Sequence, residues 1–117
     1  MRFTCTLAAL AVAAALASPL ASADPVATAS KSCSVGDSRS YGTTYVITIN
    51  VSGTSCRAGR SLIRAYHDCR PGKSGKCPSV KGYSCSEKRT KGATQYDSRV
   101  TCTKGDKTVK HVYTQYT

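Results

Sequence analysis

The sequence predicts a small α+β domain stapled by disulfides, with one helix packed on an antiparallel sheet of about four strands. Three observations predict this fold: an alternating apolar segment near residue 45, a helical segment after it, and three strand-like segments towards the C-terminus. This order is typical of a helix that covers one face of an antiparallel sheet. The chain has 117 residues, which limits it to one small domain.

The first residues have the form of an export signal. Arg2 precedes an Ala/Leu-rich run, and Ala21-Ser22-Ala23 is an A-x-A cleavage site. A membrane anchor is the alternative, but the apolar run is short and no basic stop-transfer stretch follows it. We therefore expect residues 1–23 to be a signal peptide, residues 24–32 a flexible mature N-terminus, and residues 33–117 the single domain.

Cleavage at this site leaves an even number of cysteines. An even set in an exported chain indicates disulfides, although their pairing stays open. The mature chain has eight Val, three Ile and one Leu but no Phe, Trp or Met, so its core is thin and the cross-links are expected to supply much of its stability. The expected disulfide cysteines are Cys33, Cys56, Cys69, Cys77, Cys85 and Cys102.

Residues 45–51 are the clearest strand. Apolar side chains recur there at every second position, which is the period of a half-buried strand. Gly42 marks a turn before the segment, and residues 34–40 fit a partner strand or a loop equally well. The alternating residues are Tyr45, Ile47, Ile49 and Val51.

A helix is expected to follow, from Thr54 or Ser55 to about Asp68. Either hydroxyl side chain is a suitable N-cap, and Pro71-Gly72 ends the helix and opens a polar loop that runs to Lys81. The packed face is expected to carry Cys56, Gly59, Ile63, Tyr66 and Cys69. The neighbouring face carries Arg57, Arg60 and Arg64.

The last third of the chain has the pattern of a strand meander. Its segments span residues 82–89, 95–103 and 108–116, and Lys104-Gly105-Asp106-Lys107 suits a hairpin turn between the last two. Lys110 and Thr114 are expected to face outward. The expected inward residues are Tyr96, Val100, Cys102, Val109, His111 and Tyr113.

Three short motifs resemble a pattern in small secreted proteins of actinobacteria. They are Ser55-Cys56 at the start of a basic helix, Gly82-Tyr83-Ser84-Cys85, and Val100-Thr101-Cys102-Thr103-Lys104-Gly105. The resemblance covers roughly residues 45 to 113. It implies the same layout and secretion, and it implies no activity.

The two histidines are the one candidate for catalysis. Two imidazoles with a nearby lysine can transfer protons and stabilise charge at a phosphodiester, which would make the protein a small secreted ribonuclease. His67 and His111 meet only if the end of the helix crosses the last strand. Otherwise His67 interacts with the helix dipole and His111 is a packed aromatic. The cysteine spacing contains no C-x-x-C, so we expect no metal site, and nothing indicates a cofactor.

The excess of basic residues leads to the main functional hypothesis, which is binding to anionic molecules. The chain has 17 Lys and Arg against 6 Asp and Glu, a net charge of +11, and a field of this sign attracts phosphate and other anionic groups. A solvated surface that only keeps the protein soluble is the alternative. The predicted basic face consists of Arg57, Arg60, Arg64, Arg70, Lys73, Lys76 and Lys81. A second set on the meander consists of Lys88, Arg89, Lys91, Arg99, Lys104, Lys107 and Lys110.

The functional hypothesis is therefore a secreted, cationic, monomeric protein that binds an anionic polymer, a membrane surface or nucleic acid without catalysis, with an antimicrobial or host-directed role. Tyr83 and Tyr96, which lie near basic residues, are candidates for stacking on bases or sugars. A ribonuclease with the histidine pair is one alternative. A second is an inhibitor of exported proteases, in which the loop between residues 70 and 81 presents a basic residue.

Overall fold

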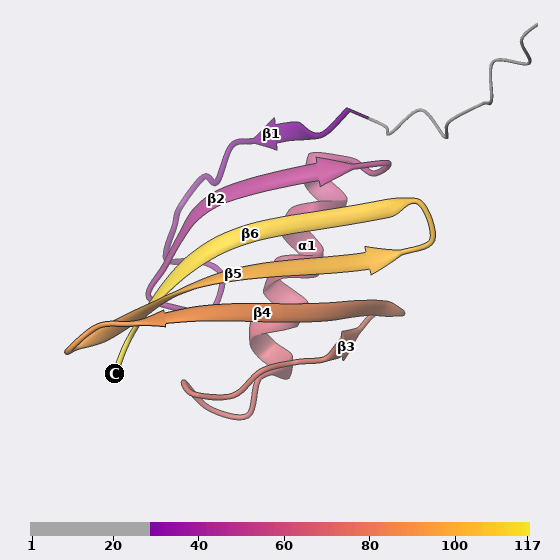
Figure 1. The fold of residues 1–117 in the computed structure, drawn as a ribbon. Helices are drawn as coiled ribbons and strands as arrows, with labels where there is room; N and C mark the ends of the chain where they lie inside the picture. The colour runs from indigo at the N-terminus through magenta and orange to yellow at the C-terminus, as the bar shows by residue number, and fades with distance from the viewer. Residues whose placement is uncertain (1–28) are drawn as a thin grey trace, which may run out of the picture.

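A computed structural model describes residues 29–117, and Figure 1 shows their arrangement. The expected signal peptide and most of the expected flexible segment lie outside the described residues. The elements in chain order are β1 (Lys31–Cys33), β2 (Tyr45–Ser52), α1 (Cys56–Cys69), β3 (Ser79–Val80), β4 (Tyr83–Lys91), β5 (Gln95–Lys104) and β6 (Lys107–Tyr116).

The strands form one antiparallel sheet in the order β1-β2-β6-β5-β4-β3, with α1 against one face. In Figure 1 the helix lies behind the sheet, so the face turned to the reader is the uncovered one. The α+β class with a single helix is confirmed. The sheet has six strands, not about four, because β1 and β3 add edge strands of three and two residues. Segments this short contain no readable period.

A β-bulge in β2 changes which of its residues are buried. The pairing with β6 is irregular between Val46 and Thr48, so Ile47 is the extra residue. Val46 is buried and Ile47 is 52% exposed. The strict alternation had placed Ile47 on the buried face of the strand, so this prediction is wrong. Beyond the bulge, Ile49 and Val51 are buried as predicted. Because of the bulge, the side chains at the start of β2 face the side of the sheet opposite to the one that the alternation predicts.

The helix begins where the sequence predicts. Ser55 is the N-cap, and its hydroxyl accepts a hydrogen bond from the Ala58 amide at 3.1 Å. Its buried face includes Leu62, Ile63 and Tyr66. Gly59 is also buried, and a Cβ at this position would lie 2.5 Å from Val51 Cγ1. The missing side chain of Gly59 therefore permits the close approach of α1 to β2.

The β5–β6 hairpin turns at Gly105 and Asp106 as predicted, and Gly105 adopts a φ of 59°. The expected inward residues of both strands are buried. Thr114 alternates with Tyr113 and so faces away from the helix, but it is buried rather than exposed. Its hydroxyl donates a hydrogen bond to Asp97 Oδ1 at 2.5 Å.

The six expected cysteines form three disulfides, each between one cysteine and the next cysteine along the chain. Cys33–Cys56 joins β1 to the start of α1, Cys69–Cys77 joins the end of α1 to the following loop, and Cys85–Cys102 crosses between β4 and β5. Together they connect the helix and its loop to the sheet. No helix within residues 29–117 has the length and hydropathy needed to cross a membrane.

Candidate functional site

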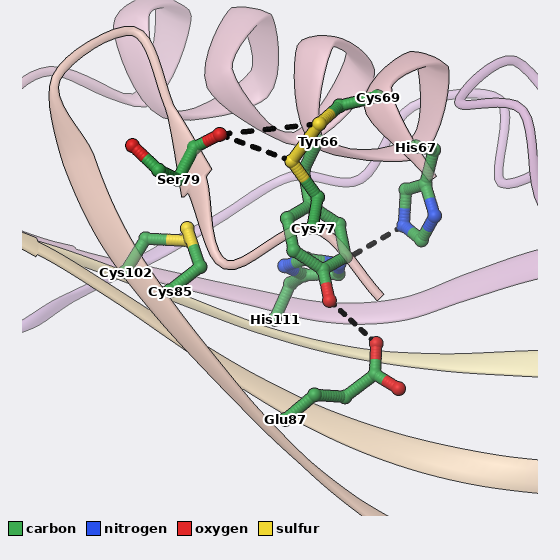
Figure 2. Close-up of a disulfide and its surroundings, with 9 residues drawn as sticks. All are labelled: Tyr66, His67, Cys69, Cys77, Ser79, Cys85, Glu87, Cys102 and His111. Carbon is green, nitrogen blue, oxygen red and sulfur yellow. Dashed lines mark hydrogen bonds between the residues drawn. A yellow bond between two sulfur atoms is a disulfide. The ribbon is translucent and has the colours of Figure 1, made fainter. Parts of the chain in front are cut away.

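A buried carboxylate organises the interior between α1 and the sheet. The Glu87 side chain on β4 is 1% exposed and accepts hydrogen bonds at Oε1 from the hydroxyls of Tyr66 and Tyr113, each at 2.6 Å. Arg89 Nε donates to Oε2 of the same carboxylate. Figure 2 shows the bond from Tyr66, which reaches Glu87 from the helix. No sequence pattern assigns Glu87 a role.

The cluster fixes the charge state of its members. Burial raises the pKa of Glu87, but the hydrogen bonds from Tyr113, Tyr66 and Arg89 outweigh burial, and the net effect is a lowered pKa. Burial and the hydrogen bond to Glu87 raise the pKa of both tyrosines far above their usual range. At neutral pH the carboxylate is therefore ionised and the phenols are protonated, which is the arrangement their hydrogen bonds require.

Arg70 does not lie on the basic surface to which the sequence analysis assigned it. It is 7% exposed, and its Nη1 donates to Tyr96 Oη at 2.9 Å while Nη2 donates to Gln115 Oε1 at 3.1 Å. The backbone leaves the helix at Arg70 in an extended conformation, and the loop beyond folds over the guanidinium, which also donates to the Lys73 carbonyl at 3.1 Å. Carbonyl, amide and phenol oxygens therefore take the place of water around this cation.

The helix arginines of the predicted basic face are at the surface. Arg57 is exposed, Arg60 donates to the Ser34 carbonyl at 3.0 Å, and Arg64 lies over the Tyr41 ring at 4.8 Å. The two latter side chains are therefore partly engaged within the protein. The lysines of the same predicted face, Lys73, Lys76 and Lys81, are exposed.

A different cationic surface lies on the uncovered face of the sheet. Lys88 on β4 is directly opposite Arg99 on β5, and Lys110 on β6 pairs with Thr101, the next residue of β5 on that face. All three cations are exposed. Their neighbours include Val112, which pairs directly with Arg99, the carboxylate of Asp97, and a set of hydroxyl and amide residues, namely Ser84, Ser86, Thr90, Thr101, Thr103, Thr48 and Asn50. We call the surface of Lys88, Arg99 and Lys110 the open-face cation row.

Few carboxylates neutralise these cations. Within residues 29–117, Arg89 and Glu87 form the one ion pair, and both belong to the interior. Asp97 shares the uncovered face with the open-face cation row, and its Oδ1 accepts the hydrogen bond from Thr114. In the described part of the chain, no hydrogen bond or ion pair engages the charged ends of Lys88, Arg99 and Lys110.

The helix does cross the last strand, so the two histidines meet. Their Nε2 atoms are 3.0 Å apart, and both rings are buried. Figure 2 shows the contact between the two rings. Burial, followed by the interaction with the His111 ring and the positive charge of Arg70, lowers the pKa of His67 to about 2. Burial also lowers the pKa of His111 to about 3, since it outweighs the attraction of Glu87.

This geometry suits packing better than catalysis. Two rings in direct contact leave no space for a phosphodiester between them, and burial favours the neutral form of both rings. The Nδ1 atoms of both rings are buried without a hydrogen-bond partner. The histidine pair is thus a buried contact between α1 and β6.

The two tyrosines expected to stack on a ligand have other positions. Tyr96 is buried, and its hydroxyl donates to the Lys73 carbonyl, so its ring is not available to a base or sugar. Tyr83 is half-buried with Lys104 over its ring at 5.8 Å. The most exposed tyrosine is Tyr116, at 47%, and it contacts Tyr45 edge-to-face.

A pocket of about 440 Å³ lies beside the C-terminal end of α1. It is bounded by the turn before β2, the end of the helix, the loop after it and the end of β6. Its lining consists of Gly42, Thr43, Thr44, His67, Arg70, Gly72, Lys73 and Gln115. Sequence patterns do not reveal this pocket because its walls come from four separate segments.

Comparisons with protein-family models, curated proteins and solved structures return no match for this chain.

Proposed function

We propose that the protein is a secreted, non-catalytic binder of anionic polymers, and that the open-face cation row is its principal contact surface. The net charge of +11 supports attraction to polyanions, and the three disulfides are compatible with an extracellular protein. The proposal differs from the sequence hypothesis in the surface it assigns.

The strand register supports the choice of the open-face cation row as the contact surface. Lys88 and Arg99 face each other across neighbouring strands, and Lys110 is diagonal to Arg99 on the next strand. Like charges in such cross-strand positions destabilise a sheet, at a cost of a few tenths of a kcal/mol or more. A bound polyanion removes this repulsion, so the arrangement is unfavourable alone and favourable in a complex.

The neighbouring side chains suit the same ligand. Hydroxyl and amide groups donate hydrogen bonds to phosphate, sulfate or carboxylate oxygens without adding charge, and several lie on the same face of the sheet as the three cations. The helix set is less available to a ligand, because two of its three arginines are engaged within the protein.

Two triple variants test the assignment, because each removes three positive charges. The first is Lys88→Gln/Arg99→Gln/Lys110→Gln, and the matched control is Arg57→Gln/Arg60→Gln/Arg64→Gln on the helix. Binding of the oxidised protein to labelled single-stranded RNA and to a sulfated polysaccharide would be followed as salt is raised. For RNA, each neutralised phosphate contributes about 0.7 to the slope of log affinity against log salt.

We expect the sheet variant to lose about two units of that slope and at least tenfold in affinity, while the helix variant loses much less. Equal losses of affinity in both variants would mean that the overall positive charge causes the binding, and would refute the surface assignment. Absence of binding by the unmodified protein at low salt would refute the function itself. The same gels report RNA cleavage, which the proposal excludes and the ribonuclease alternative requires.

A further inference from the structure

Arg70 is a buried cation that has no carboxylate partner. Glu87, the buried carboxylate nearby, forms its ion pair with Arg89, and Arg70 donates to neutral oxygens of Tyr96, Gln115 and the Lys73 backbone. Buried charges in proteins are normally paired with an opposite charge, because an unpaired charge in the interior loses its hydration without compensation. The interior beside the pocket therefore carries an excess positive charge.

The guanidinium also retains hydrogen-bonding capacity. Arg70 Nε is buried and has no partner, although Nη1 and Nη2 both donate within the protein. Nε and a neighbouring Nη form the planar fork with which arginine binds two oxygens of a carboxylate or phosphate. The unpaired side of the Arg70 guanidinium can thus donate hydrogen bonds to an oxyanion.

The histidine pair supplies a second donor. Two neutral rings joined through their Nε2 atoms share one proton there, so one ring must carry its proton on Nδ1. The Nδ1 atoms of both rings are buried without a partner, so the missing acceptor does not separate them, but His111 is not among the residues that line this pocket. His67 lines the pocket, where a ligand can accept a hydrogen bond. We assign the Nδ1 proton to His67.

The rest of the pocket suits an anion. Lys73 is among the lining residues and no acidic side chain is, while the hydroxyls of Thr43 and Thr44 are hydrogen-bonded to the end of β6. Asp68, the neighbouring acid on α1, is exposed and outside the lining. The volume of about 440 Å³ falls within the range of small-molecule sites, about 300–1,000 Å³, so an organic group fits beside the anion.

We propose that this pocket binds a single phosphate or sulfate group, through Arg70, the Nδ1–H of His67 and Lys73. The group is either a free ion or the charged end of a small ligand. This site lies on the helix side of the sheet and is separate from the open-face cation row. The pocket proposal can therefore be tested independently of the polymer-binding proposal.

The test is an NMR titration of the oxidised protein with inorganic phosphate, sulfate and phenyl phosphate, which reads the ring nitrogens of both histidines. The unbound protein should show His67 in the Nδ1-protonated form. Titration should shift the His67 ring signals, with smaller shifts at His111. A His67 ring protonated on Nε2, or ring signals that do not respond to any of the three anions, would overturn the proposal.

Two lysines of the same loop provide a matched pair of variants. Lys73 lines the pocket, whereas Lys76 is exposed and lies outside the lining. Lys73→Gln should weaken phosphate binding about tenfold, and Lys76→Gln should change it less than twofold. Equal weakening would mean that general charge, and not the pocket, attracts the ion.

A third variant separates this site from the polymer surface. The Lys88→Gln/Arg99→Gln/Lys110→Gln protein should bind phosphate in the pocket as the unmodified protein does, even if it no longer retains RNA. Phenyl phosphate binding more tightly than inorganic phosphate would identify a small organic ligand. Equal binding of the two would identify the free ion. Loss of pocket binding in this variant would contradict the existence of a separate site.

Discussion

Single polar residues in the interior take roles that their sequence neighbours do not indicate. Glu87 receives hydrogen bonds from Tyr66 on α1 and Tyr113 on β6, which are distant from it along the chain. Arg70 follows a run of surface arginines, yet it is buried beneath its own loop. A residue's partners decide whether its charge is solvated or enclosed, and those partners are set by the fold.

The histidine pair makes stability depend on pH. Burial holds the pKa of His67 near 2 and that of His111 near 3, whereas both are about 6.5 in an unfolded chain. Between these values the unfolded state binds protons that the folded state does not, so the free energy of unfolding falls as pH decreases below about 6.5. The slope is up to about 1.4 kcal/mol per pH unit for each ring.

We predict that His67→Gln removes about half of this slope between pH 6.5 and 5, a window above the titration of Glu87. Urea denaturation at several pH values measures it, with Lys76→Gln as a control that keeps both histidines. A variant with the same slope as the unmodified protein would show that His67 remains protonatable in the folded state.

At the scale of elements, local signals predicted the helix and the long strands because each has a clear period. The N-cap at Ser55, the turn at Gly105 and the alternation of β5 and β6 all agree with the structure. The bulge at Ile47 does not appear in the pattern, since it depends on the pairing of β2 with β6. Strands of two or three residues were missed for lack of length.

Gly59 gives a prediction about the contact between α1 and β2. Alanine has a higher helix propensity than glycine by about 1 kcal/mol, so Gly59→Ala would stabilise an isolated helix. In the protein the new Cβ would lie 2.5 Å from Val51 Cγ1 and force the elements apart. We expect a net loss of about 1–3 kcal/mol in the free energy of unfolding, measured by urea denaturation.

Ser61→Ala at an exposed helix position is the control and should change stability by less than about 0.5 kcal/mol. A gain in stability from Gly59→Ala would contradict the close packing of the helix on β2.

At the scale of the whole molecule, the disulfides compensate for a thin core. The three bridges join residues separated by 23, 8 and 17 positions, and loops of this size stabilise a fold by about 3 kcal/mol each. Their sum is comparable to the total stability of a small domain, about 5–15 kcal/mol. The fold therefore depends on oxidation.

We predict that the fully reduced and alkylated chain is unfolded at 25 °C. Far-UV circular dichroism and amide hydrogen exchange would measure this, with the oxidised protein in the same buffer as reference. A reduced chain that keeps its β-sheet spectrum and its protected amides would show that the hydrophobic core suffices.

The sequence by itself determined the α+β class, the helix with its cap, the hairpin turn, the cysteines that pair and the sign of the charge, because each depends on composition or on short periodic patterns. Only the tertiary structure decided the disulfide pairing, the edge strands, the burial of Arg70 and the contact between His67 and His111. It also decided which cations share a surface, since Lys88 and Arg99 become neighbours through strand pairing. Most of these features join residues distant in sequence, and local patterns carry no record of such contacts; β3 and the Cys69–Cys77 bridge are local, but their segments are too short or too irregular to show a period.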